Sequence, residues 1–216
     1  YWPKRALHLA GGQTEGEKIA IRYYLDQGAS ILAQAPLGGE TISYYKNSSD
    51  IIQQSPTEEI TNLINEGVSV ITFFGHSSSN TFDYSINEPQ SLDNAGRYPI
   101  LFALGCNAGQ IFNNYKSLSE SYVFEPRKGA AAFVGTSSVG YLNALGEEIQ
   151  AVYQSMNRLG GAETTLGLAL KGAFEAMADR HSTIELSLVQ TTILHGDPAL
   201  KLPFAQGPDW VIDSKS

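Results

Sequence analysis

The chain is poor in cysteine, in positive charge and in long apolar runs. One cysteine occurs in 216 residues, so no disulfide bond can form within the chain. Lys and Arg number 14 against 22 Asp and Glu, and the resulting formal charge of −8 opposes binding to phosphate backbones. No stretch approaches the roughly 20 apolar residues that a membrane-spanning helix needs. These absences argue against a disulfide scaffold, a nucleic-acid-binding protein and a membrane-spanning segment.

What remains is a composition typical of a folded domain. Hydrophobic residues make up 42% of the chain and aromatic residues 10%, which argues against intrinsic disorder. Charged residues are sparse, and Ser, Asn, Gln and Thr supply much of the polar surface, which favours a protein outside the cytoplasm. We expect one domain over residues 1–205, followed by a linker at 206–216 that leads toward a further domain.

Apolar runs alternate with helical patterns, which is typical of an α/β fold with a mainly parallel sheet. Strands are expected at residues 5–10, 31–35, 68–74, 100–104 and 129–134, with an edge strand at 199–202. Helices are expected at 14–26, from Ser55-Pro56 to Gly67, and at 117–124, 146–158 and 162–178. Residues 183–194 fit either a helix or a strand.

Reactive side chains follow two of the buried strands. Gly75-His76 comes after one apolar run and Gly105-Cys106 after the next. In α/β sheets functional groups gather at the carboxyl ends of strands, and an imidazole can help to deprotonate a thiol. The backbone N–H groups of Ser77 and Cys106 are candidate donors to an oxyanion. Position alone leaves open that Cys106 is a buried, inert core residue.

Five segments together resemble the gingipain-type cysteine peptidases of the caspase-like clan. In chain order they are VITFFGHSSSNTFD, PILFALGCNAGQIF, SESYVF, GAAAFVGTSSVGY and LHGDPALKL. The resemblance implies a three-layer α/β/α sandwich, a catalytic dyad of His76 and Cys106, and a peptide or protein substrate. It also implies a bacterial protein that is secreted or held at the cell surface, often through the type IX secretion system, and that carries flanking domains.

The chain departs from the family pattern near the proposed dyad. Ser77 stands where relatives usually have Gly, and Gly105 replaces the usual Ala. Relatives carry an acidic residue after the first strand that orients the histidine, whereas LHLAGGQ has Gly at the nearest position. Glu15 or Glu17 could approach the histidine, but Glu17 lies three residues after Thr14, a spacing better explained by a helix-capping role. We therefore expect the acidic third member to be absent.

The resemblance also places part of the substrate pocket in the loop after the small-residue strand. Thr136, Ser137 and Tyr141 are the candidate substrate-binding residues, Tyr141 lying where Arg-specific relatives have an aromatic ring. Arg or Lys specificity is not carried over, because no pocket acid is assured. We expect Glu120 to have a structural role and Asp197 to begin a turn.

The remaining polar candidates do not suggest a metal or cofactor. His8 and His195 have no further ligands at metal-binding spacing, so both are expected to be structural and no cofactor is expected.

The sequence thus predicts a cysteine endopeptidase that forms a thioester. Two alternatives stay open: a weak or inactive peptidase-fold module used for binding or secretion, and a sortase-like transpeptidase.

Overall fold

A six-stranded sheet forms the centre of the molecule. The computed structural model describes residues 2–48, 50–51, 53–54, 57–86, 88–160, 164–179 and 182–202. The strand order is β2-β1-β4-β6-β7-β8, and only β8 runs antiparallel to its neighbour. The strands are β1 (Arg5–Ala10), β2 (Glu40–Tyr45), β4 (Val70–Phe74), β6 (Ile100–Leu104), β7 (Ala132–Thr136) and β8 (Thr192–Gly196). The expected α/β fold with a mainly parallel sheet is confirmed.

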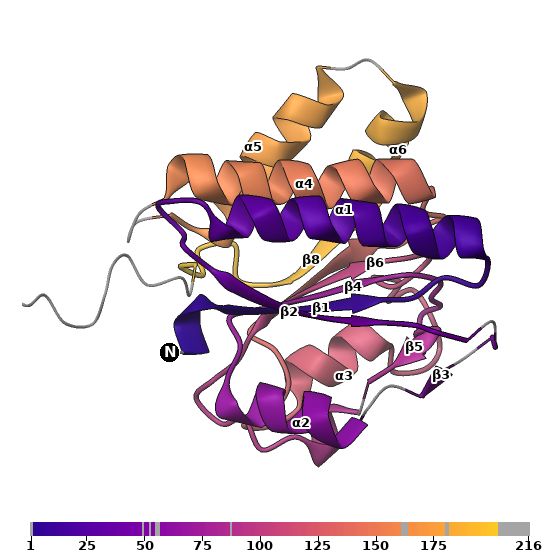
Figure 1. Cartoon of the computed structure of the whole chain (residues 1–216), viewed down its shortest axis with the longest axis vertical. Helices are drawn as coiled ribbons and strands as arrows, with labels where there is room; N and C mark the ends of the chain where they lie inside the picture. Colours follow the sequence, from indigo (N-terminus) through magenta and orange to yellow (C-terminus); the bar gives the residue numbers. More distant parts are fainter. Residues whose placement is uncertain are drawn as a thin grey trace, which may run out of the picture.

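Helices cover both faces of the sheet (Figure 1). One face carries α1 (Glu15–Ala33), α4 (Leu142–Leu159), α5 (Leu166–Ala178) and α6 (Thr183–Thr191), and the other carries α2 (Thr57–Glu66) and α3 (Leu118–Phe124). Minor elements are the paired strands β3 (Gln53–Gln54) and β5 (Tyr84–Ser85) and the 3₁₀ turns at Trp2–Lys4 and Pro89–Ser91. The three-layer arrangement agrees with the sandwich expected from the resemblance.

The central strands are apolar on both sides because helices cover both sides. Every residue of β4 and β6 is buried. Val70 and Phe74 pack in the core beneath α1 and α4, whereas Ile71 and Phe73 pack in the core beneath α2 and α3. This alternation explains why the runs are continuously hydrophobic instead of alternating with polar residues. The parallel pairing of β4 with β6 places the carboxyl ends of the two strands side by side.

The predicted strand at residues 31–35 is wrong, because α1 continues to Ala33. The buried residues of α1 are Ile21, Leu25, Gly28 and Leu32, whose spacing of four, three and four is helical. The second strand in the chain is instead β2, an edge strand with half-exposed residues.

Two further segments near the C-terminus differ from or refine the expectation. The ambiguous residues 183–194 divide into α6 and β8. No strand forms at 199–202, where Lys201 makes only an isolated bridge to Thr165. The expected helix starts at Ser55-Pro56 and residue 162, and the proposed linker at 206–216, lie outside the described residues. None of the described helices is long and apolar enough to cross a membrane.

Candidate active site

His76 and Cys106 lie beyond the ends of neighbouring parallel strands. Phe74 at the end of β4 pairs with Leu104 at the end of β6, and the Gly75 N–H donates to the Leu104 carbonyl at 3.1 Å. Each reactive residue follows its strand by one glycine. Both line one cavity of about 210 Å³. The structure therefore brings the two predicted catalytic residues to the same site.

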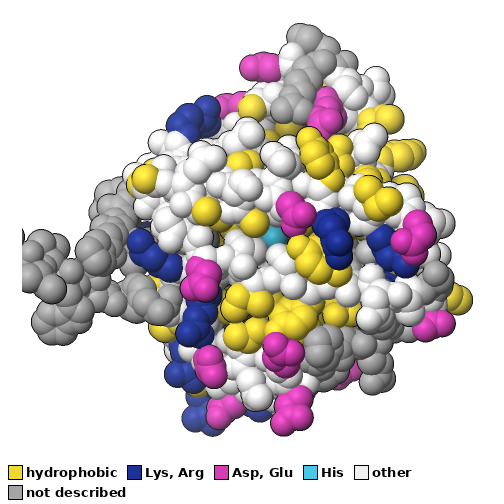
Figure 2. Space-filling view, viewed as in Figure 1, with side chains coloured by type: hydrophobic (Ala, Val, Ile, Leu, Met, Phe, Trp, Pro, Cys, Tyr) yellow, Lys and Arg dark blue, Asp and Glu magenta, His cyan; other side chains and the backbone are white. Residues whose placement is uncertain are grey.

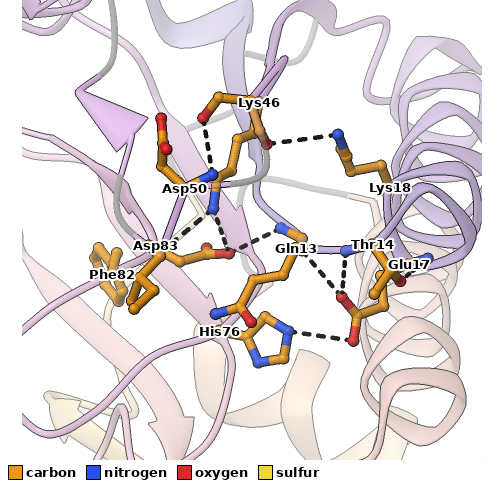
Figure 3. Close-up of polar contacts among 12 residues, drawn as sticks. Gln13, Thr14, Glu17, Lys18, Lys46, Asp50, His76, Phe82 and Asp83 are labelled. Atoms are coloured by element: carbon orange, nitrogen blue, oxygen red, sulfur yellow. Dashed lines mark hydrogen bonds and ion pairs between the residues drawn. The ribbon is translucent and has the colours of Figure 1, made fainter.

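Glu17 contacts the imidazole of His76 (Figure 3). Its Oε1 lies 3.3 Å from His76 Nε2, while its Oε2 accepts the N–H groups of Gln13 at 2.9 Å and Thr14 at 3.0 Å. The expectation that Glu17 only caps the helix is wrong, since one carboxylate oxygen caps and the other meets the histidine. An acidic side chain thus contacts the imidazole, from α1 and not from the Gly11-Gly12 loop.

The capping bonds also set the charge of Glu17. The N–H of Thr14, then that of Gln13, and the neighbouring His76 lower the pKa of Glu17 to about 2, although partial burial opposes them. Glu17 is therefore ionised at neutral pH and faces His76 as an anion. Because backbone groups hold this carboxylate, its position beside Nε2 of the ring is fixed.

The Cys106 thiol lies against the loop that follows β7. Its Sγ is 3.4 Å from the N–H and 3.6 Å from the carbonyl oxygen of Gly140. The next residue, Asn107, has a positive φ of 55° and donates its N–H to the Ser138 carbonyl at 2.8 Å. This left-handed turn bends the chain away immediately after the cysteine. The side chain is half-buried, so it is neither sealed in the core nor fully exposed.

The two departures from the family pattern are linked in space. The Ser77 hydroxyl donates to the Cys106 carbonyl at 2.8 Å and so joins the loop of the histidine to that of the cysteine. A Cβ added at Gly105 would collide with the same hydroxyl. The serine therefore fits because position 105 is glycine, and the alanine usual in relatives would not fit beside it.

Both backbone donors expected at an oxyanion site are unoccupied. Within the described part of the chain, neither the Ser77 N–H nor the Cys106 N–H donates a hydrogen bond. The short hairpin after His76 is instead closed by the Ser78 N–H to the Thr81 carbonyl and by the Asp83 N–H to the His76 carbonyl. Free N–H groups at this site can donate hydrogen bonds to the oxyanion of a tetrahedral adduct.

The rest of the cavity is largely apolar. Beyond the reactive groups its walls include Ile21, Phe74, Leu142 and Leu145. Tyr141, 58% exposed, is the one predicted substrate-binding residue that lines it. Such walls suit an apolar side chain or an apolar stem.

Thr136 and Ser137 are directed elsewhere. The Thr136 hydroxyl bonds the Thr191 hydroxyl at 2.9 Å, and the Ser137 hydroxyl donates to the Thr191 carbonyl at 3.0 Å. Neither lines the cavity of His76 and Cys106. Their contacts join the loop after β7 to the end of α6.

Other polar candidates have local structural contacts. Glu120 forms a capping box with Ser117 at the start of α3, and Asp197 accepts the Ala199 N–H at 2.8 Å. His8 is buried, and burial lowers its pKa to about 3, so it is neutral at pH 7. Among the described residues no group of three or more His, Cys, Asp or Glu is arranged to hold a metal. Sequence reasoning missed one buried ion pair beside the site, Lys46 with Asp83.

The fold, and the order of the histidine and cysteine loops along the chain, can be compared with known families. The profile of peptidase family C25 matches residues 1–203. The chain belongs to peptidase family C25. Its family is one of cysteine peptidases, which agrees with a thiol, an imidazole and a carboxylate around one cavity. Comparison with curated protein sequences finds no match.

Solved structures show the same fold at low identity. The Arg-specific cysteine proteinase gingipain R is 18% identical, with a TM-score of 0.72 over 92% of this chain and 47% of that one. The complex of Porphyromonas gingivalis RgpB pro- and mature domains is also 18% identical, with a TM-score of 0.74 over 92% and 48%. Caspase-1 from Spodoptera frugiperda is 15% identical, with a TM-score of 0.54 over 96% and 91%. This C25 chain thus spans about half the length of the gingipain chains.

Proposed function

We propose that this C25 chain is a cysteine endopeptidase with Cys106 as nucleophile and His76 as general base and acid. The observation that carries the proposal is the cavity that the imidazole and the thiol share, in which Glu17 contacts Nε2 of the ring. A base oriented by a third group is the arrangement that activates a nucleophile. The contact of Glu17 also removes the main argument for an inactive module, namely the missing acid.

The residues support a thioester mechanism. Cys106 Sγ loses its proton to His76 and attacks the scissile carbonyl carbon, and the N–H groups of Ser77 and Cys106 stabilise the oxyanion. The adduct collapses as the C–N bond breaks, His76 protonates the leaving amine, and an acyl thioester remains on Cys106. His76 then takes a proton from water, whose oxygen attacks the thioester and expels the thiolate.

Assays of Cys106→Ala and His76→Ala beside the parent on a peptide library test the proposal. We expect no turnover for the first and a loss of about 100-fold to 10,000-fold for the second. Equal turnover by Cys106→Ala would refute the nucleophile. Product analysis with an added amine separates hydrolysis from transpeptidation, since an amide product would come from attack of the amine on the thioester.

Iodoacetamide tests the site without any substrate. We expect Cys106 to be alkylated faster in the parent than in His76→Ala, because the imidazole promotes the thiolate. Equal, slow alkylation would favour a binding module with an inert thiol.

The same proposal places the protein outside the bacterial cytoplasm, with flanking domains in the full-length protein. The resemblance to exported peptidases and the sparse surface charge support it. Cell fractionation with an antibody to the domain tests it, and recovery from the cytoplasm alone would contradict it.

A further inference from the structure

A buried ion pair lies beside the site without belonging to it. Lys46, directly after β2, places its Nζ 3.4 Å from Asp83 Oδ2, and the two side chains are 0% and 3% exposed. Burying two charges costs several kcal/mol per ion unless geometry and further hydrogen bonds compensate. Such a pair adds little net stability compared with apolar side chains, so its position in the fold is what needs explanation.

Asp83 connects the loops that carry Glu17 and His76 (Figure 3). Its Oδ2 accepts the Gly12 N–H at 2.9 Å, in the loop that leads from β1 to the start of α1. Its own N–H donates to the His76 carbonyl at 2.8 Å, in the loop after β4. One residue thus holds the backbone on both sides of the Glu17–His76 contact.

Lys46 extends this connection to a third strand end. Its N–H donates to the Ala10 carbonyl at 2.8 Å, and its Nζ lies 3.4 Å from the Ile51 carbonyl oxygen as well as from Asp83. The ammonium group therefore fixes the carboxylate of Asp83 from the β2 side while the backbone of Lys46 is tied to the end of β1.

Two glycines leave the space that this carboxylate occupies. A Cβ added at Gly11 or at Gly75 would collide with the Asp83 carboxylate. Gly75 is also the residue that separates β4 from His76. The loop that leads to Glu17 and the loop that carries His76 thus both pack directly on Asp83 at a glycine, with no side chain between.

From these contacts we infer that the Lys46–Asp83 pair is a positioning element that sets the Glu17 loop against the His76 loop. This inference rests on the proposed function, because the ion pair acts through His76 and Glu17. The His76 side chain is 47% exposed, and within the described ranges its one polar side-chain contact is that with Glu17. The backbone that Asp83 holds is therefore a second polar constraint on the position of the ring.

The test uses two double variants. Asp83→Leu/Lys46→Met removes both charges and the bond to Gly12, and replacement of a buried pair by apolar residues is commonly neutral for stability. Asp83→Asn/Lys46→Met removes the charges but keeps an oxygen for the Gly12 N–H. We expect the first to lower kcat about tenfold or more with little change in KM, and the second to recover part of that loss.

A second readout does not depend on turnover. NMR of ¹⁵N-labelled histidine, with His76 assigned through His76→Ala, reports the ring environment. In Asp83→Leu/Lys46→Met the His76 ring signals should move toward those of Glu17→Gln, well below the unfolding temperature. Unchanged ring signals and kcat in that variant would overturn the inference.

Asn94→Ala is the matched control for loss of stability. Asn94 is fully buried and bonds Gly129 near the amino ends of β6 and β7, away from the carboxyl ends that carry His76 and Cys106, so its loss should lower the unfolding temperature without moving the His76 signals. If the control moves them equally, the inference fails. If the parent shows no turnover and no His76-dependent alkylation, the proposed function fails. The His76 ring signals of the parent and of Asp83→Leu/Lys46→Met still test whether the ion pair positions the ring.

Discussion

At the scale of single residues, Ser77 and Gly105 form a matched pair that can be exchanged together. Gly105→Ala should drive the Ser77 hydroxyl away from the Cys106 carbonyl, because the new methyl group occupies its place. Ser77→Gly/Gly105→Ala should relieve the collision with the hydroxyl, while the close approach of the new methyl group to the Gly75 carbonyl oxygen remains. We expect a coupling of about 1 kcal/mol or more between the two substitutions in urea unfolding of the four proteins. Additive free energies of unfolding would show that the two positions are independent.

The two roles of Glu17 can be separated by substitution. Glu17→Gln removes the charge that faces His76, so kcat should fall about tenfold or more with KM nearly unchanged. Thr14→Ala removes the other half of the capping box and should cost about 1 kcal/mol of stability while kcat is retained. Steady-state kinetics and urea unfolding measure both. An equal kcat for Glu17→Gln and the parent would leave Glu17 with capping alone.

The residue scale also shows what sequence reasoning can reach. The meeting of His76 and Cys106 at one cavity was predictable because each follows a continuously apolar strand, a pattern that is local in the chain. Glu17 was assigned to capping because Thr14 explained it fully, and the contact with His76 spans 59 residues of sequence. The pairing of Lys46 with Asp83, 37 residues apart, has no local pattern at all.

At the scale of elements, the missed boundaries have a common cause. Ile31 and Leu32 look like a strand alone, but they continue the buried stripe of α1 set by Ile21 and Leu25. The edge strand β2 was missed because its residues are half-exposed and lack an apolar run. Residues 183–194 were ambiguous because a helix and a strand adjoin at Thr191–Thr192 without a breaking residue. Continuous central strands were predictable, whereas edges depend on partners far away in the chain.

A buried carboxylate on α4 predicts a pH dependence of stability. Burial raises the pKa of Glu148 to about 7, and a hydrogen bond from Thr192 at 2.7 Å opposes part of the rise. The raised pKa therefore lowers the free energy of unfolding as the pH rises. This loss is absent below about pH 4.5 and complete above about pH 7. It amounts to about 3 kcal/mol at most. Glu148→Gln should accordingly raise the free energy of unfolding relative to the parent at about pH 8 and not at about pH 4.5.

The neighbouring carboxylate on the same helix supplies the control for this comparison. Glu147→Gln removes one negative charge from α4 without removing the buried group. Urea unfolding of the three proteins at both pH values measures the difference, and other groups such as His8 titrate alike in all of them. A gain for Glu148→Gln that is the same at both pH values would contradict ionisation of Glu148 as the cause.

At the scale of the whole molecule, the net charge of −8 should bias the choice of substrate. Acidic and basic side chains are interspersed on the face drawn in Figure 2, and the bias follows from the overall excess of carboxylates in the chain. Peptides with the same residues at the scissile bond but lysines at their ends should show a higher kcat/KM than versions with glutamates there.

Salt separates this long-range effect from contacts in the cavity. The screening length falls from about 30 Å at about 0.01 M salt to about 3 Å at about 1 M, so the ratio of the two kcat/KM values should fall toward one as salt rises. A neutral peptide of the same core controls for effects of salt on the enzyme itself. A ratio that stays constant would place the preference in direct contacts within the cavity lined by His76 and Cys106, at distances shorter than the screening length.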